Sequence, residues 1–486
     1  MEKIIQTKLF INNKYIDSVS NTNFPTYNPT NGKLITNVSD AQKEDVDLAI
    51  SAARYAFDEG PWRKFTGYQR SLLLLKLAEL ISQHSEKISH IEVLDNGKPI
   101  SSAREDVAGS VQLLHYYAGF ADKLHGQTIP FNGPYFVYTR KEPIGVCAAI
   151  LPWNFPFSTF IWKVAAPLAA GCTLVIKPAE MTPLSALYCG QLFVEAGFPE
   201  GVVNIISGFG LTCGRPLCQS EKIDKISFTG STEVGYEIMR TSHVNNLKRI
   251  TLELGGKSAN IILDDADIDQ AVYQSLKSSF CTQGQCCIAP GRIFVQEKIY
   301  DEFCKKAIDL AAKRRIGDPF NEETEHGPQI DNIQCDRILK LIKSGVEEGA
   351  KLLYGGSRIE RDGFFIQPTV FSEVEDQMKI AREEIFGPVM VILKFKTIDE
   401  VIKRANSSRY GLGAGIFTKN MENSIKITNA LKAGTVYLNC YDVCGVNTPF
   451  GGFKDSGIGR ELGEAGIQIY TELKTVVCKT TEDTLP

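Results

Sequence analysis

The sequence lacks several features that define whole classes of protein. No apolar run approaches the roughly 20 residues that a membrane-spanning helix needs, so no membrane partner is expected. The formal net charge is only −4 and the basic residues are dispersed, which gives no reason to expect nucleic acid as a partner. Internal repeats and low-complexity segments are also missing, and disorder is therefore not the default expectation.

Disulfides and metal centres have equally little support. The 13 cysteines are an odd number in a long chain, and no secretory signal precedes them, so reduced thiols are expected. No Cys-x-x-Cys pair occurs, and the six histidines are scattered, so no metal site is expected. The start of the chain, from Met1 to Lys3 onward, resembles neither a signal peptide nor a transit peptide, and a cytoplasmic location is the expectation.

The 486 residues allow about three domain-sized units, and 43% hydrophobic content provides a substantial core. Strand-like and helix-like segments alternate in two consecutive blocks, a pattern typical of parallel α/β sheets. In the first block the predicted strands are Val146–Leu151, Thr173–Ile176, Val202–Ile206, Ile226–Phe228, Ile250–Leu254 and Asn260–Leu263. A helix is predicted over Pro183–Ala196, with Thr182 as its N-cap and Gly197 as its stop.

The second block follows Gln285. Its predicted elements are the strands Arg292–Val295, Lys351–Tyr354, Val389–Phe395, Gly413–Phe417 and Thr435–Asn439 and the helices Lys298–Ala312, Asp331–Gly349 and Asp399–Ala405. Two further segments, Tyr135–Thr139 and Thr471–Val477, mix polar and apolar residues. They are typical of half-exposed strands that lie outside either sheet and pair with another partner.

Two segments carry candidate reactive groups. Cys287 lies in a glycine-containing turn, where backbone N–H groups can stabilise a nucleophilic thiolate, although most cysteines are simply small buried hydrophobes. Glu253 stands in an apolar strand just before Gly255 and Gly256, and burial would make it a general base near neutrality. An equally good interpretation pairs Glu253 with Lys257 or with a helix end.

Three more segments are expected to follow strands of the first block, where open α/β sheets bind ligands. Asn154, between two prolines, either donates to a developing oxyanion or bonds its own backbone in a rigid turn. Gly230, Ser231 and Gly235 belong to a turn that could hold a pyrophosphate at a helix N-terminus, although the stretch is not a Gly-x-Gly-x-x-Gly fingerprint. Lys177 and Glu180 supply a cation and a carboxylate, or form a surface salt pair.

Taken together, these segments resemble the aldehyde dehydrogenase superfamily over essentially the whole chain, closest to its cytosolic class 1, retinal and mitochondrial class 2 enzymes. The motifs that carry the resemblance are Leu252–Ser258, Gly284–Ala289, Pro152–Pro156, Glu383–Pro388, Pro449–Gly452 and Gly457–Gly463. The resemblance implies a modified Rossmann NAD-binding domain (1–124 and 144–255), an α/β catalytic domain (256–455) and a small β oligomerisation arm (125–143 and 456–486). It further implies a homotetramer.

The resemblance also assigns roles to the candidate residues. Cys287 would attack an aldehyde, the Asn154 amide would stabilise the oxyanion, and Glu253 would activate water to hydrolyse the thioester to a carboxylic acid. NAD would be the cofactor, because a carboxylate at Glu180 repels the 2′-phosphate of NADP. Its binding residues would be Trp153, Lys177, Glu180, Gly230, Ser231, Gly235, Glu384 and Phe386.

The substrate tunnel implied by the resemblance is lined by Gly109, Phe155, Trp162, Cys281 and Phe450. Because Gly109 and Cys281 stand where mitochondrial relatives carry bulkier residues, a wide tunnel for a large apolar aldehyde such as retinal is expected. Lys277, Thr282 and Pro290 depart from the family pattern. Two alternatives stay open: a catalytically silent, crystallin-like relative, and a dehydrogenase for semialdehydes or betaine aldehyde.

Overall fold

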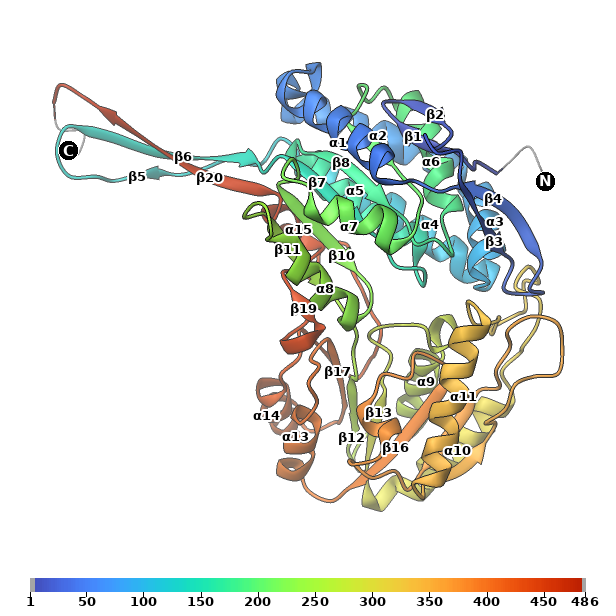
Figure 1. Cartoon of the computed structure of the whole chain (residues 1–486). Helices are drawn as coiled ribbons and strands as arrows, with labels where there is room; N and C mark the ends of the chain where they lie inside the picture. Colours follow the sequence, from blue (N-terminus) through green and yellow to red (C-terminus); the bar gives the residue numbers. More distant parts are fainter. Residues whose placement is uncertain (1–4, 483–486) are drawn as a thin grey trace.

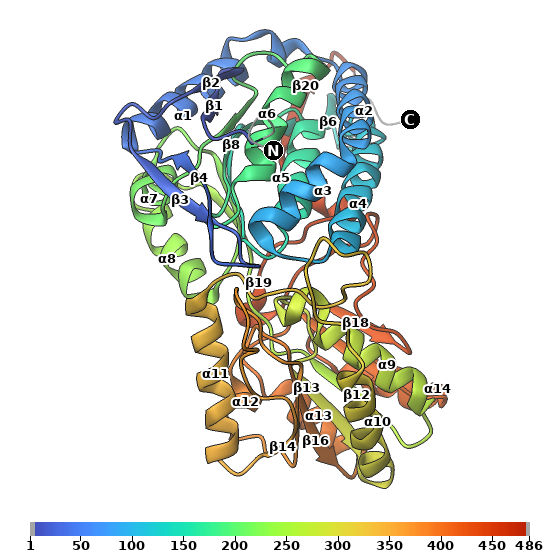
Figure 2. The same cartoon turned by 90° about the vertical axis from the view of Figure 1, so that its right-hand side faces the viewer.

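The computed structural model describes residues 5–482, which form two stacked α/β units and a projecting arm (Figure 1). The stretch Met1–Lys3, from which the cytoplasmic location was inferred, lies outside the described residues. In Figure 2 the helices α2 (Gly67–Gln83), α3 (Ser85–Asn96) and α4 (Ile100–Ala118) lie in the upper unit, above the strands of the lower one. The α/β architecture predicted from the alternating segments is confirmed.

The upper unit is built on an eight-stranded sheet in the order β19-β11-β10-β7-β8-β9-β1-β2. The strands from β11 to β9 are parallel, and β19, β1 and β2 pair antiparallel at the two edges. Their bounds are β1 Leu9–Ile11, β2 Lys14–Ile16, β7 Val146–Ile150, β8 Thr173–Lys177, β9 Val203–Ile205, β10 Lys225–Thr229, β11 Arg249–Glu253 and β19 Gly457–Ile458. A two-stranded ribbon, β3 (Asn23–Tyr27) and β4 (Leu34–Ser39), lies beside this sheet.

Both faces of the upper sheet are apolar, because helices cover each of them. Along β7 and β8, Cys147, Ala149 and Leu174 pack with one set of helices, whereas Ala148 and Val175 pack with the other set. The first set contains α2, α4, α5 (Pro156–Ala170) and α6 (Leu184–Ala196); the second contains α1 (Lys43–Asp58), α7 (Arg215–Gln219) and α8 (Thr232–Ser242).

The lower unit has a seven-stranded sheet in the order β14-β15-β16-β13-β12-β17-β18, parallel except for the edge strand β14. Its strands are β12 Ala259–Ile262, β13 Arg292–Gln296, β14 Lys351–Tyr354, β15 Thr369–Ser372, β16 Val389–Phe395, β17 Gly413–Phe417 and β18 Thr435–Leu438. Its helices are α9 Ile268–Ser279, α10 Tyr300–Ala312, α11 Asn332–Glu347, α12 Lys379–Arg382, α13 Ile398–Asn406 and α14 Met421–Ala430. The short helix α15 (Gly463–Gln468) leads from the C-terminal motif toward the arm.

The arm is a three-stranded antiparallel sheet of β5 (Thr128–Ile129), β6 (Tyr135–Pro143) and β20 (Thr471–Lys479). Nine consecutive pairs join β20 to β6, from Thr471 with Pro143 to Lys479 with Tyr135. Both segments expected to lie outside the two main sheets therefore do so, and they pair with each other. Within the described residues, the outer edge of β20 has no strand beside it.

Two predictions from the sequence pattern were wrong in detail. The strand placed last in the first block pairs with β13 and β17 and belongs to the lower sheet. The helix expected at Pro183 begins at Leu184, and Thr182 does not cap it. The Asp95 carboxylate from α3 accepts the Leu184 N–H at 3.1 Å instead, a contact between segments far apart in the sequence.

Across residues 5–482, no helix is long and apolar enough to cross a membrane. The same part of the chain holds no group of three or more His, Cys, Asp or Glu side chains that could bind a metal ion.

Candidate active site

Several predicted site residues follow strands that end together at one edge of the upper sheet. The register pairs Lys177 with Ile150, Ile150 with Phe228, and Phe228 with Leu252. The segments after β8, β7, β10 and β11 therefore begin at one level, as expected for parallel strands. This edge faces the lower unit, from which the segment containing Cys287 approaches.

The Cys287 segment is held by unusual backbone geometry. It follows a short 3₁₀ turn (Cys281–Gly284) in which Thr282, Gln283 and Gly284 have φ values of 45°, 58° and 74°. A Cβ on Gly284 would lie 2.0 Å from the Gly387 carbonyl oxygen, and one on Gly256 would lie 2.3 Å from that of Cys287. Only glycine fits at these two contacts, so the half-buried Cys287 is fixed against the end of β11.

Asn154 connects the two units at this point. Its side-chain amide donates to the Gln285 carbonyl oxygen at 2.9 Å, two residues before Cys287, and the side chain is buried. Asn96 in turn donates to the Trp153 carbonyl oxygen at 2.7 Å and so anchors the segment that carries Asn154. Asn154 does not bond its own backbone, and its amide is bound to the segment that carries Cys287, as a donor to an oxyanion there would need to be.

Glu253, the last residue of β11, is a buried carboxylate whose Oε2 has no hydrogen-bond partner. Burial raises its pKa well above the usual value of 4.5, and the nearby carboxylate of Glu461 raises it further. Lys163 and Arg460 act in the opposite direction. Glu253 forms no ion pair with Lys257 in the described residues, so it is available as a proton acceptor.

The thiols beside Cys287 stay protonated. The pKa of Cys281 is raised well above 9 by its hydrogen bond with Cys286 and by burial. For Cys286 the contact with Cys281 lowers the pKa, but the hydrogen bond with Cys287 and burial raise it by more. Neither neighbour is therefore suited to be the nucleophile, which favours Cys287 for that role.

The predicted nucleotide residues line the same edge. Ser231 is the N-cap of α8 and accepts the Val234 N–H at 3.3 Å, while Gly235 packs so closely on β11 that a Cβ would lie 2.7 Å from Leu254. A Cβ on Gly230 would lie 2.4 Å from the Phe228 ring. The exposed turn at the start of α8 thus presents backbone N–H groups and the positive end of a helix dipole, which suits a phosphate.

Lys177 and Glu180 lie at the end of β8. The Lys177 ammonium is buried, donates to the Pro178 carbonyl oxygen at 3.0 Å and lies 3.5 Å from the half-buried Glu180 carboxylate. This is not a pair of solvated surface charges. A cation and a carboxylate that can each form further hydrogen bonds at the sheet edge fit the hydroxyl groups of a ribose.

Next to this sheet edge lie Glu384 and Phe386 from the lower unit and Trp153 from the upper unit. The Glu384 Oε1 accepts the Gly256 N–H at 2.9 Å, and a Cβ on Gly255 would lie 2.4 Å from Oε2. Trp153 and Phe386 meet edge to face, with ring centroids 5.3 Å apart. Glu384 and Phe386 line the same hollow as Cys286, the residue before Cys287, so they could hold the reactive end of a dinucleotide.

Four of the five predicted tunnel residues pack in one cluster with the thiol. Phe155, Trp162, Cys281, Cys287 and Phe450 pack in one hydrophobic cluster, and the rings of Trp162 and Phe450 are 5.4 Å apart. Gly109 on α4 lies outside this cluster and has open space around the position of a Cβ.

Lys277, exposed near the end of α9, lies close enough to the Asp442 carboxyl to influence its charge. Pro290, one of the departures from the family pattern, is buried and lines the hollow beside Gly256 and Glu384.

Several buried charges near the site were missed. Lys98, fully buried, bonds Asp106 at 2.5 Å and lies over the Phe155 ring at 4.8 Å. Lys163 on α5 bonds Glu461. Their only signal in the sequence is an ionisable residue within an apolar segment, and the partners are too distant in the chain to be paired without coordinates.

Comparisons with known proteins agree with this geometry. The model of the aldehyde dehydrogenase family matches residues 15–476. The mitochondrial aldehyde dehydrogenase of Mesocricetus auratus is 54% identical over 98% of this chain and 96% of its own length. Retinal dehydrogenase 2 of Homo sapiens is 53% identical over 98% and 92% of the two chains.

Solved structures give the same result. An NAD+ complex of aldehyde dehydrogenase from Bacillus cereus has a TM-score of 0.96 and 46% identity, covering 98% of this chain and 96% of its own. Betaine aldehyde dehydrogenase from Staphylococcus aureus, also in complex with NAD+, has a TM-score of 0.96 and 38% identity, with coverage of 99% and 96%. This chain belongs to the aldehyde dehydrogenase family.

Proposed function

We propose that this protein oxidises aldehydes to carboxylic acids with NAD, through a covalent thioester on Cys287. The observation that carries the proposal is the meeting of three groups at the junction of the two units. They are the Cys287 thiol, the Asn154 amide anchored at the Gln285 carbonyl, and the unpartnered Glu253 carboxylate. A nucleophile, an oxyanion donor and a base are the set that acyl transfer requires.

The residues act in two stages. The Cys287 thiolate attacks the aldehyde carbon, and the Asn154 amide stabilises the oxyanion of the resulting thiohemiacetal, together with the Cys287 N–H. Loss of hydride from that carbon leaves a thioester. Glu253, whose pKa is raised by burial, then takes a proton from water, which hydrolyses the thioester and frees the thiol.

NAD, when bound, accepts the hydride. The site fits it at three points: the exposed turn at Gly230 and Ser231 for the pyrophosphate, Lys177 with Glu180 for the adenosine ribose, and Glu384 for the nicotinamide ribose. The Glu180 carboxylate disfavours the extra phosphate of NADP through charge repulsion. The relatives crystallised with NAD+ support the same assignment.

The substrate is proposed to be a bulky apolar aldehyde, of which retinal is one example. The aromatic rings of Phe155, Trp162 and Phe450 make the inner tunnel apolar, and the open space beside Gly109 widens it. Similarity to retinal dehydrogenase 2 supports this choice, although the mitochondrial relatives are equally similar. Betaine aldehyde dehydrogenase is the less favoured model, at 38% identity.

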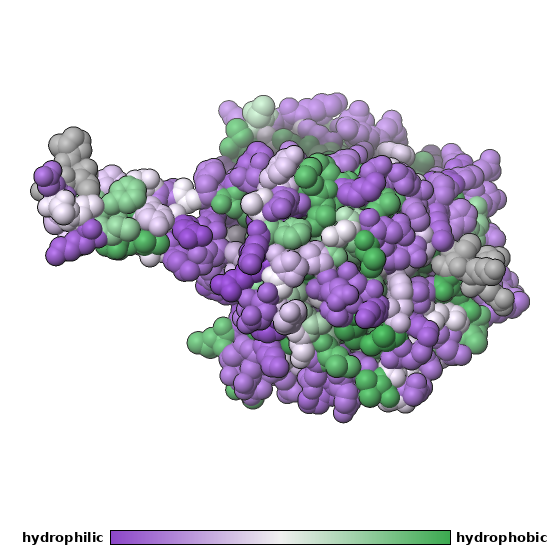
Figure 3. Space-filling view, turned by 90° about the horizontal axis from the view of Figure 1, so that it is seen from above, coloured by the Kyte–Doolittle hydropathy of each residue, from purple (hydrophilic) through white to green (hydrophobic). Residues whose placement is uncertain are grey.

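The arm supports a homotetramer as the assembled state. The outer edge of β20 has free backbone groups within the described structure, and such edges pair readily with a second strand. Arm residues Phe136, Leu473 and Val477 expose 43%, 64% and 57% of their surface. Figure 3 shows apolar residues among the polar ones on the projecting arm. Contact with other copies of this chain would bury them.

The test is NADH formation at 340 nm by the purified protein, with aldehydes from acetaldehyde to retinal and with NAD or NADP. Wild type should prefer NAD, and Cys287→Ser should reduce turnover by at least about 10⁴-fold, because the hydroxyl is a far weaker nucleophile. Cys444→Ser, at an exposed cysteine, is the matched control and should keep full turnover. A wild type that binds NAD but oxidises no aldehyde would favour the silent, crystallin-like alternative.

A further inference from the structure

Lys257 is a buried cation for which the reaction described above has no role. It lies between β11 and β12, with 3% of its surface exposed. Its ammonium group makes no hydrogen bond or ion pair with any residue from 5 to 482. Burying an unpaired ammonium is costly, so its retention there calls for a physical reason.

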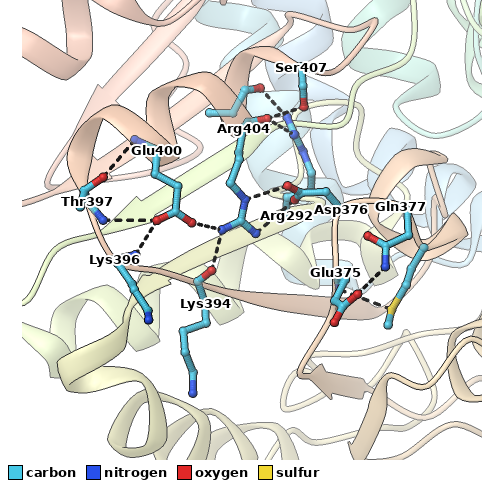
Figure 4. A network of polar contacts seen from close by, with 12 residues as sticks. Arg292, Glu375, Asp376, Gln377, Lys394, Lys396, Thr397, Glu400, Arg404 and Ser407 are labelled. Carbon is cyan, nitrogen blue, oxygen red and sulfur yellow. Dashed lines mark hydrogen bonds and ion pairs between the residues drawn. The ribbon is translucent and has the colours of Figure 1, made fainter.

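The backbone of Lys257 is clamped in place. Arg292 donates to the Lys257 carbonyl oxygen through Nε at 3.1 Å and Nη2 at 3.0 Å, and to the carbonyls of Arg404 and Ala405 at the end of α13. Figure 4 shows Arg292 beside Arg404, which is itself fixed by Asp376 and Glu400. The Lys257 stem packs on Gly291, where a Cβ would lie 2.8 Å from Cδ and 3.3 Å from Nζ.

The lysine faces the same hollow as Glu384. Gly256, Lys257, Gly291, Glu384 and Phe386 all line it. Glu384 accepts one hydrogen bond there, from the Gly256 N–H to Oε1, while Oε2 accepts none from the described residues. The free oxygen is the one available to a ribose hydroxyl, and Lys257 is the cation next to it inside the protein.

The charges around this pair come from four further elements. Arg337 on α11 and Arg292 on β13 are cations, Glu233 on α8 and the adjacent Glu383 are anions, and Tyr410 follows α13. Burial raises the pKa of Glu384 to about 7, and the Gly256 hydrogen bond, the Arg337 charge and the Lys257 charge oppose that rise. Burial and the Arg292 charge lower the pKa of Lys257 to about 7.

We propose that Lys257 is a positioning residue that keeps Glu384 ionised, so that its free oxygen can accept a hydrogen bond from the nicotinamide ribose. This inference rests on the proposed use of NAD. A protonated Glu384 would lose much of its acceptor strength, because a charged acceptor makes the stronger bond. Lys257 thereby sets the pH range in which the cofactor is held tightly, without touching the cofactor itself.

The experiment measures the dissociation constant for NAD by calorimetry from pH 6 to pH 9. In wild type the affinity should rise through about pH 7, as Glu384 loses its proton. Lys257→Met keeps the length of the stem and removes the charge, so the midpoint should move up by about one pH unit, with roughly 5-fold weaker binding at pH 7. The NAD affinities of wild type and Lys257→Met should converge at pH 9. The NAD affinity of Glu384→Gln should not change with pH in this range.

The matched control is Lys340→Met. Lys340 is exposed on α11, the helix that also carries Arg337, and its charge is not among those that act on Glu384, so the midpoint should stay at the wild-type value. If Lys257→Met binds NAD more weakly by the same factor at every pH, or binds as wild type does, Lys257 is only structural and the proposal is overturned.

A second measurement needs no Lys257 variant. Wild type titrated at pH 6, where Lys257 is already charged and Glu384 is mostly protonated, should release most of a proton on binding NAD, as measured in two buffers of different ionisation enthalpy, and Glu384→Gln should release none. Equal release by both proteins overturns the proposal even if Lys257→Met does not fold. A wild type that binds no NAD at any pH would instead refute the proposed function itself.

Discussion

A single buried carboxylate, Glu253, determines how the thioester would be hydrolysed. In Glu253→Gln the thioester should form normally and then persist. Rapid kinetics should show a burst of about one NADH per subunit, followed by turnover at least ~10²-fold slower than in wild type, since a positioned base contributes about that much. The absence of a burst would contradict this role and would place Glu253 in activation of the thiol.

The pH dependence of this step follows from the same residue. Only ionised Glu253 accepts a proton, so the rate of the slow step in wild type should rise with pH through its raised pKa. The effect on stability has the opposite sign. A carboxyl whose pKa is raised in the folded state contributes its full stabilisation of that state at low pH. The contribution is lost as the pH rises through the raised pKa. Glu253→Gln should therefore unfold no more readily than wild type at pH 8.

Individual residues differ in how far the sequence predicts them. Cys287 and Glu253 stand in local motifs whose residue types indicate their chemistry, and the structure links the Cys287 segment to Asn154 through the Gln285 carbonyl. Lys257 lies in the same motif as Glu253, but its burial without a partner depends on Gly291, Arg292 and Glu384, which are distant in the chain. Electrostatic roles of this kind need coordinates, because nothing local encodes the partner.

The turn before Cys287 shows what a short element contributes. Three consecutive residues with positive φ bring the Gly284 Cα against the Gly387 carbonyl. Gly284→Ala would place a methyl group into that contact in a disfavoured backbone region, at a cost of about 1–3 kcal/mol. We expect a lower melting temperature and a fall in kcat of about 10²-fold, because Cys287 would be displaced from Asn154.

Gly109→Ala is the control for Gly284→Ala. It lies inside α4, its φ is not positive, and nothing occupies the space of the added methyl group. The substitution should stabilise the helix by about 0.5–1 kcal/mol, as alanine does in place of glycine. If both variants melt alike in differential scanning calorimetry, the backbone argument for Gly284 is wrong.

At the level of elements, strands were easier to predict than their partners. Short apolar runs bounded by turns identify β7, β8 and β10 because both faces of the sheet are covered and every side chain except that of Thr229 is buried. The same runs cannot show which sheet a strand joins, and so β12 was grouped with the wrong block. Likewise, α6 starts where Asp95 caps it rather than where Pro183 suggested.

The whole molecule is divided between two stacked units and an exposed arm. The site lies at the junction of the units, where each contributes what the other lacks: Glu253 and Asn154 from the upper one, Cys287 and Glu384 from the lower. The arm contributes none of these groups (Figure 1). Its exposed apolar residues and unpaired edge therefore have a separate explanation, which is assembly.

Assembly can be tested without touching the site. Leu473 and Val477 lie on one face of β20, since they are four residues apart on a strand. Replacing both by lysine should weaken association at least 10-fold, because two charges would have to be desolvated in the contact. Sedimentation velocity should show a tetramer for wild type and smaller species for Leu473→Lys/Val477→Lys.

The control changes other positions of the same strand in the opposite sense, from charged to apolar. Lys474→Leu/Lys479→Leu alters the same strand but removes lysines, and it should not reduce the size of the assembly. NAD affinity should stay at the wild-type value in the double-lysine variant, since the arm lies apart from the residues that line the cofactor site. If wild type sediments as a monomer, the expectation of a tetramer is wrong, and the exposed apolar residues of the arm contact something other than copies of this chain.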